Sequence, residues 1–144
     1  MTIIQKYLKY KQSYQKLLRI HIVRIHFSTF FSMSVQNVFG YVTGWVQNVM
    51  FRQTLMRAAI KRGIIAGATN NKNDHYRVDF SMKGPEPKIN ELLNEIKSGK
   101  VLNSWGARAL DVKITDSGKD PLEHKVNTTT VDTFNWDKDV EFYL

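Results

Sequence analysis

Residues 76 to 83, YRVDFSMK, alternate strictly between apolar and polar side chains. Tyr76, Val78, Phe80 and Met82 fall on one side, and the residues between them are charged or carry a hydroxyl group. Successive side chains of a β-strand point to opposite faces of a sheet, so this segment is predicted to be a strand with one face on the core and the other in solvent. The chain is therefore expected to build a sheet with one covered face.

The segment that follows this strand has the period of an amphipathic helix. The stretch GPEPK contains two prolines and a glutamate, which suit the start of a helix. Ile89, Leu92, Leu93 and Ile96 then recur at helical spacing until Gly99. This pattern predicts a helix whose apolar stripe packs on a sheet.

Another strand is predicted near residue 40. Residues 35 to 43, VQNVFGYVT, are β-branched and aromatic, with Val38 and Val42 on one face and Phe39 and Tyr41 on the other. We expect this strand to be buried on at least one face.

A helix is predicted from Phe51 onward, and Gly63 is a suitable residue to end it. One face of this helix is expected to carry Phe51, Leu55, Ala58, Ala59 and Arg62, and the opposite face Gln53, Arg57 and Lys61.

Two more segments have strand character. Residues 63 to 71, GIIAGATNN, predict a short apolar strand that runs into the polar turn NNKNDH. Residues 106 to 115, GARALDVKIT, alternate again, with Leu110, Val112 and Ile114 sharing one face.

The last part of the chain is mostly polar. Residues 116 to 139 are rich in Thr, Asn and Asp, and we expect them to form a long loop with little regular structure. The closing residues 140 to 144, VEFYL, are predicted to add an edge strand through Val140, Phe142 and Leu144.

The predicted element order is β-α-β-β-α-β plus a C-terminal edge strand. Two helices on one face of a four- or five-stranded antiparallel sheet give a ferredoxin-like α+β sandwich. This architecture supports many unrelated functions, so the function must be argued from a site.

The formal net charge of +8 is concentrated at the N-terminus. Residues 1 to 32 contain six basic residues and no acid, which leaves a net charge of +2 for the other 112 residues. Nucleic-acid binding by the folded part is therefore not expected. RNA binding on the sheet is the weakest reading, because no exposed strand shows paired aromatics; the basic residues that prompt it are Arg57, Lys61, Arg62, Lys72 and Arg77.

Residues 1 to 32 allow two interpretations. Their basic, acid-free composition and amphipathic helical pattern resemble a mitochondrial transit peptide, and charged residues interrupt the apolar run, so no membrane span is expected. Alternatively, translation starts at Met33 and the segment has no function. The first interpretation predicts a mitochondrial location and the second a cytoplasmic one, with residues 33 to 144 forming the domain in both.

The stretch GWVQNVMFR, residues 44 to 52, connects the first predicted strand to the first helix. A turn at Gly44 that enters a helix gathers backbone N–H groups and the positive end of the helix dipole at one place. Arg52 falls in the first helical turn, where a cation opposes the dipole, so its position favours a bound anion.

These residues resemble the acylphosphatase family, whose members carry a loop of the form G-x-V-Q-G-V-x-F-R between the first strand and the first helix. An asparagine stands eighteen residues after the arginine in that family, and here this position is Asn70. The stretch KGPEPKINELLNEI also looks like the entry into the family's second helix. The resemblance covers roughly residues 35 to 114 and the last strand. Its loop matches are Gly44, Val46, Gln47, Val49, Phe51 and Arg52.

Three positions depart from the family pattern. Asn48 stands where the family has its second loop glycine, Trp45 replaces a usually basic residue, and AGATNN lacks a Gly-Trp pair before Asn70. The backbone at Asn48 is expected to be left-handed, a conformation that asparagine tolerates better than most residues.

The resemblance implies hydrolysis of a small acyl phosphate to a carboxylate and phosphate, with no metal or other cofactor. Arg52 would bind the phosphate as a fork, and Asn70 would hold the attacking water. Asn70 and Asn71 could equally be turn formers. A catalytically silent module that binds phosphate-bearing or protein partners through the same loop is the alternative, and a monomer is expected. The residues expected to surround the phosphate are Gly44, Trp45, Val46, Gln47, Asn48, Val49, Met50 and Phe51.

Overall fold

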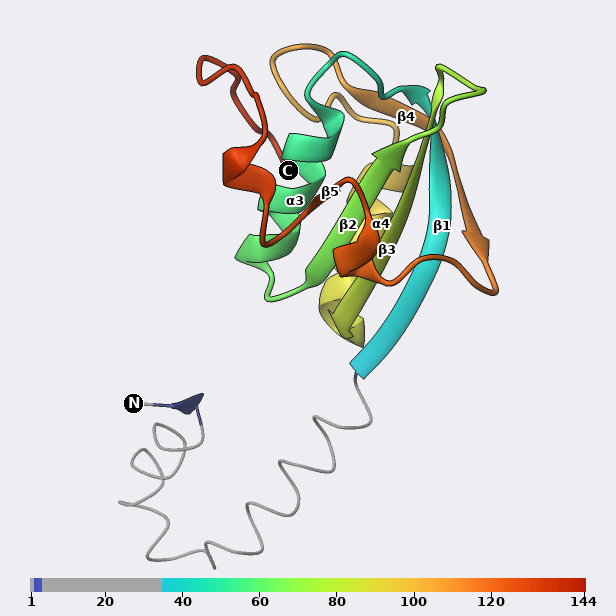
Figure 1. The fold of residues 1–144 in the computed structure, drawn as a ribbon, viewed down its shortest axis with the longest axis vertical. Coiled ribbons are helices and arrows are strands. Elements are labelled where there is room, and N and C mark those ends of the chain that lie inside the picture. The colour runs from blue at the N-terminus through green and yellow to red at the C-terminus, as the bar shows by residue number, and fades with distance from the viewer. Residues whose placement is uncertain (1, 4–34) are drawn as a thin grey trace, which may run out of the picture. The chain divides into compact units, whose positions relative to one another are not determined.

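Five antiparallel strands form one sheet in the order β4-β1-β3-β2-β5, and two helices pack against it (Figure 1). The computed structural model describes residues 2–3 and 35–144, so the helical pattern expected within residues 1 to 32 lies outside the described residues. The strands are β1 (Val35–Trp45), β2 (Ile65–Asn70), β3 (Arg77–Pro85), β4 (Arg108–Thr115) and β5 (Val126–Asn127), and the helices are α3 (Phe51–Lys61) and α4 (Glu86–Lys97).

One face of the sheet and both helices share a single hydrophobic core. The register pairs Val42 with Val78 and Val38 with Met82, which places these side chains on the same face. All four are buried, whereas Phe39 on the other face of β1 is half-buried. The predicted ferredoxin-like α+β architecture is therefore confirmed, and the alternation in β1 and β3 identified the core face correctly.

Helix α4 buries the four residues that its period predicted, namely Ile89, Leu92, Leu93 and Ile96. Helix α3 departs from its prediction at Gln53, which was expected on the outward face but is 5% exposed. Its side-chain amide donates to the carbonyl oxygen of Val131 at 3.0 Å, so a distant segment covers that face.

The pattern predicted for β4 is wrong at Leu110, because the strand contains a β-bulge. The pairing between β1 and β4 shifts between Thr43 and Gly44, so Leu110 is left unpaired and 64% exposed while Ala109 is buried. Leu110 therefore does not share the buried side of Val112. A Cβ atom at Gly44 would overlap the carbonyl oxygen of Arg108, so the close approach of β4 requires a glycine at this position of β1.

The fifth strand lies elsewhere than expected. It is formed by Val126–Asn127, which pair with Gly67 and Ala68 of β2. The prediction of a strand over residues 140 to 144 is wrong, because Phe142 makes only an isolated bridge, to Asn103. A two-residue strand is too short to produce a visible period in the sequence.

Residues 116 to 139 are mostly irregular, as predicted, but they contain three short regular elements. They include two 3-10 helices, η1 (Pro121–Glu123) and η2 (Val131–Thr133), in addition to β5. His124 contacts Ser81 at 2.9 Å, and Ser81 is fully buried. The face of β3 that was expected in solvent is therefore covered at Ser81.

Tyr76 precedes β3 and is 58% exposed, so the first apolar residue of the alternating stretch does not join the core. Its ring instead meets the exposed Trp45 ring edge-on, with the ring centres 5.7 Å apart. No helix within residues 2–3 and 35–144 has the length and apolar character needed to cross a membrane.

Candidate active site

The loop between β1 and α3, residues 46–50, is held in place by hydrogen bonds to the β2–β3 connection and to Asn103. The amide of Gly44, just before it, donates to the carbonyl oxygen of Tyr76 at 2.8 Å. The side-chain nitrogen of Asn103 donates to the carbonyl oxygen of Val49 at 2.8 Å. Gln47 reaches the turn between β2 and β3, where its side-chain nitrogen lies 3.0 Å, 3.1 Å and 2.8 Å from the carbonyl oxygens of Asn71, Asp74 and Arg77, respectively.

Two residues of this β1–α3 loop have a left-handed backbone. Asn48 has a φ of 64°, which confirms the expectation for the position where the acylphosphatase pattern has glycine. Met50, the N-cap residue of α3, has a φ of 59°, which the sequence did not indicate. Such conformations are unfavourable for residues other than glycine and concentrate at functional sites, so the loop is held in a specific shape.

The loop and the start of α3 present unpaired backbone amides. The first hydrogen bond of the helix runs from the amide of Thr54 to the carbonyl oxygen of Met50. Within residues 35–144, the amides of residues 47–53 donate to no protein acceptor, and α3 has neither a side-chain cap nor an acidic residue in its first turn. These amides and the helix dipole favour an anion at this end of α3.

Arg52 supplies a cation to the same place. Its side chain is half-buried, and its guanidinium makes no ion pair or hydrogen bond with any residue in the described part of the chain. By contrast, Arg57 pairs with Asp132 and Arg62 pairs with Glu95. Burial lowers the pKa of Arg52 from its ordinary value, because the charged form loses hydration without gaining a partner. A bound anion would supply the missing partner.

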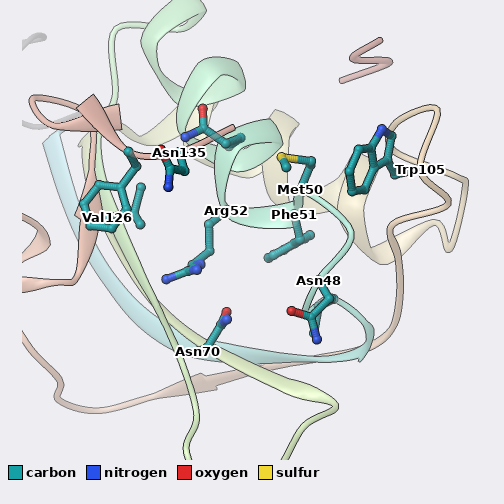
Figure 2. A pocket seen from close by; sticks show the side chains of 11 residues that line it. Asn48, Met50, Phe51, Arg52, Asn70, Trp105, Val126 and Asn135 are labelled. Carbon is teal, nitrogen blue, oxygen red and sulfur yellow. The ribbon is translucent and has the colours of Figure 1, made fainter. Parts of the chain in front are cut away.

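Asn70, the last residue of β2, faces Arg52 across the pocket (Figure 2). Its side-chain oxygen is buried and accepts no hydrogen bond from the described residues. Asn71 instead stabilises the following turn, because its side-chain oxygen accepts from the amides of Asn73 and Asp74. Of the two asparagines, Asn71 is thus the turn former, and Asn70 leaves an acceptor free at the pocket.

These groups line a cavity of about 390 Å³. No acidic residue lines it, and Arg52 is the single cation among its described lining residues. A buried cation, free amides and an unpaired acceptor in one cavity suit an oxyanion together with a water molecule. The lining residues are Val46, Asn48, Met50, Phe51, Arg52, Gln53, Asn70, Trp105, Val126, Phe134 and Asn135.

Of the ten residues that the sequence placed at the site, six line the cavity and four do not. Gly44 lies in β1, and Trp45 packs against Tyr76. The side chain of Gln47 points to the turn, and Val49 packs against the core. The lining residues from the predicted set are Val46, Asn48, Met50, Phe51, Arg52 and Asn70.

Sequence reasoning missed five lining residues. Gln53 was assigned to an outward face, and Trp105 had no assigned role. Val126, Phe134 and Asn135 belong to the segment that was expected to be an irregular loop. The apolar residues Val126, Val131 and Phe134 within a polar stretch were the local signals of burial there.

His124 lies outside this cavity, in a hydrogen-bonded cluster beneath the segment that covers β3. It contacts the hydroxyl groups of Thr69 and Ser81, each at 2.9 Å. Burial and then the charge of Lys119 lower its pKa, which favours the neutral ring. Among the described residues, no cluster of three His, Cys, Asp or Glu side chains could hold a metal ion.

Comparisons with known proteins identify the family of this chain. A sequence model of the acylphosphatase family matches residues 38–127. Among solved structures, the chain is similar to an acylphosphatase from Bacillus subtilis, with 24% identity, a TM-score of 0.46, and coverage of 56% of this chain and 82% of that chain. It is also similar to an acylphosphatase from Coxiella burnetii, with 19% identity, a TM-score of 0.49, and coverage of 58% and 82%. A comparison with curated proteins found no match. Because the family match spans more than half of its residues, the chain belongs to the acylphosphatase family.

Proposed function

We propose that this protein hydrolyses small acyl phosphates to a carboxylate and inorganic phosphate. In this reaction a water oxygen bonds to phosphorus, the bond between phosphorus and the carboxylate oxygen breaks, and the proton of the water passes to the phosphate product. Phosphoryl transfer of this kind depends mainly on positioning and charge stabilisation. The cavity beside α3 offers groups for both tasks.

Arg52 and the free amides of residues 47–53 bind the phosphoryl group. The guanidinium donates to two phosphate oxygens as a fork, and the amides donate to the others. The half-buried position of Arg52 strengthens these interactions, because less water screens the charge. In the transition state negative charge is spread over the phosphoryl oxygens. Donors placed at these oxygens therefore lower the barrier to reaction.

Asn70 positions the attacking water. Its unpaired side-chain oxygen accepts a hydrogen bond from the water and directs a lone pair of the water oxygen toward phosphorus. Because Asn70 faces Arg52 across the cavity, one bound phosphate can meet both side chains (Figure 2). Holding water and phosphate together removes much of the entropic cost of their encounter.

The leaving group needs no strong general acid. A departing carboxylate has a conjugate acid with a pKa of roughly 4, so it is stable at neutral pH without a proton. The absence of His, Asp and Glu among the described lining residues is compatible with this chemistry.

The observation that best supports the proposal is the half-buried, unpaired Arg52 guanidinium opposite the unpaired Asn70 oxygen. The direct test is hydrolysis of benzoyl phosphate by the full chain, measured as a loss of ultraviolet absorbance. Arg52→Ala is expected to lower kcat/KM by about 10³-fold and Asn70→Ala by about 10²-fold, comparable to the loss of one preorganised donor elsewhere. Arg52→Lys keeps the charge but loses the fork and should recover only part of the activity.

The matched control is Lys97→Ala, which removes a cation from the exposed face of α4. It is expected to keep wild-type kinetics. A folded wild-type protein that binds phosphate without turning over any acyl phosphate would refute the enzyme and favour a silent phosphate-binding module. Equal activity in wild type and Arg52→Ala would refute the assigned site.

A further inference from the structure

Residues 128–144 lie beyond the part of the chain that matches the acylphosphatase family, yet they help to form the pocket. The family match ends at residue 127, whereas Phe134 and Asn135 line the same cavity as Arg52. Figure 2 shows Asn135 on the opposite side of Arg52 from Asn48. The wall that faces the β1–α3 loop therefore includes residues outside the range of the family match.

Helix α3 holds this wall in a fixed position. The buried Gln53 side chain donates to the carbonyl oxygen of Val131 at 3.0 Å. One turn later, Arg57 pairs with Asp132 at 2.9 Å. Both anchors are on the helix that carries Arg52, so the wall keeps its position relative to the guanidinium.

The rest of the segment is also anchored. The Arg57 guanidinium lies 4.1 Å from the centre of the Trp136 ring. Farther along, Lys61 donates to the carbonyl oxygen of Leu144 at 2.9 Å. The amide of Tyr143 donates to the carbonyl oxygen of Leu102 at 2.9 Å. In Figure 1 this final part of the chain, drawn in red, lies beside α3.

The charge of the cavity limits the ligands that it can accept. Its only cation among the described lining residues is Arg52, which the phosphate would occupy. A second carboxylate on the acyl group would lose hydration without finding another cation. The volume of about 390 Å³ falls in the range of roughly 300–1,000 Å³ that is typical of small-molecule sites, so an acyl group can enter together with the phosphate.

We propose that Phe134 and Asn135 bind the acyl group and select uncharged, apolar acyl phosphates over those with a second carboxylate; this inference rests on the proposed function. The β1–α3 loop holds the phosphate from one side, so the acyl group extends toward the opposite wall. There the Phe134 ring, which packs against the core, offers apolar contact, and the Asn135 amide can donate to the acyl carbonyl oxygen.

The test compares kcat/KM of the full chain for benzoyl, acetyl and succinyl phosphate. Phe134→Ala is expected to lower the benzoyl-to-acetyl ratio about tenfold, and Phe134→Leu should recover most of that ratio. Asn135→Lys adds a cation and should raise the succinyl-to-acetyl ratio about tenfold. The matched control is Tyr143→Ala, which removes an exposed aromatic ring from the same segment outside the pocket lining and should keep both ratios.

Two kinetic results would overturn the inference. One is unchanged ratios in folded Phe134→Ala and Asn135→Lys. The other is a loss of benzoyl preference in Trp105→Ala but not in Phe134→Ala, which would place the acyl group at the rim formed by Trp105.

Binding measurements separate this inference from the proposed function. Calorimetric titration with benzylphosphonate and methylphosphonate reports acyl-side selection without turnover. A preference for benzylphosphonate that Phe134→Ala removes, in a protein that hydrolyses no acyl phosphate, would refute the hydrolase and support the acyl-side wall. Turnover of acyl phosphates with no dependence on Phe134 in either assay would refute the wall alone.

Discussion

Replacing Asn103 by alanine is expected to loosen the β1–α3 loop, although Asn103 does not line the cavity. The Asn103 side chain is fully buried and uses both of its ends. Its nitrogen donates to the carbonyl oxygen of Val49 and the hydroxyl of Thr54, both at 2.8 Å. Its oxygen accepts from the amides of Trp105 at 2.8 Å and Ala107 at 3.2 Å. One side chain thus connects the loop, α3 and the segment before β4.

The expected loss of stability follows from which groups remain buried. The Ala107 amide would lose its partner in a buried position, at a cost of about 1–3 kcal/mol, whereas the partly buried Val49 and Trp105 groups can bind water in part. Adding the cavity left by the side chain, we expect a loss of about 2–4 kcal/mol in the free energy of unfolding. Urea denaturation followed by tryptophan fluorescence should show a midpoint lower by about 1–2 M.

The kinetic effect distinguishes a loosened loop from general destabilisation. Asn103→Ala should lower kcat/KM for benzoyl phosphate by about 10–100-fold, because the amides of the loop lose their fixed geometry. Leu93→Ala on α4 is the matched control: it should cost about 2–4 kcal/mol in stability but keep the kinetics of the wild type. A loss of less than about 1 kcal/mol together with unchanged kcat/KM in Asn103→Ala would refute this reasoning.

Three further predictions follow from the site and its surroundings. Inorganic phosphate at about 100 times its Kd should stabilise the protein by about 2.7 kcal/mol in thermal or urea unfolding, and Arg52→Ala should abolish this effect while sodium chloride at equal ionic strength should not reproduce it. Asn48→Gly should leave the free energy of unfolding nearly unchanged, whereas Asn48→Val should lower it by about 1–2 kcal/mol in urea, since a β-branched residue resists the left-handed backbone; equal stability of the two variants would contradict this. Burial and the charge of Lys119 lower the folded-state pKa of His124 below the unfolded value of about 6.5, although the nearby carboxylates of Asp79, Glu123 and Asp120 act in the opposite direction. Between these two pKa values the unfolded state binds a proton that the folded state does not. The free energy of unfolding should therefore fall as the pH drops from about 6.5 toward the folded-state pKa. Urea unfolding at several pH values should show a shallower fall in His124→Gln, and parallel curves would argue against it.

The elements with a clear local period could be predicted from the sequence. Val78, Phe80 and Met82 point to the core because a strand alternates, and Leu92 and Leu93 do so because a helix repeats every 3.6 residues. The family resemblance also identified Arg52 and Asn70, whose positions near each other depend on strand pairing between distant residues. Their catalytic roles stay predictions.

The arrangement of residues 116–139, which cover one face of β3, could not be predicted because their buried side chains make polar contacts. His124 is 6% exposed beside the hydroxyl groups of Thr69 and Ser81, and Asn127 is 4% exposed with its side-chain nitrogen on the carbonyl oxygen of Leu122. A polar residue reads as exposed until its partner is known, and these partners are up to 55 residues away. The wall at Phe134 depends on the same kind of long-range contact.

The way in which Gln47 recognises the turn after β2 has a consequence for natural variation. Its side chain contacts main-chain oxygens, which every amino acid provides, so Lys72, Asn73 and His75 can be exchanged and the charge of that surface can drift freely. An insertion or deletion of one residue there would shift the oxygens out of reach. Homologous chains that keep a glutamine at this position are therefore expected to differ in the residues of this turn but to agree in its length.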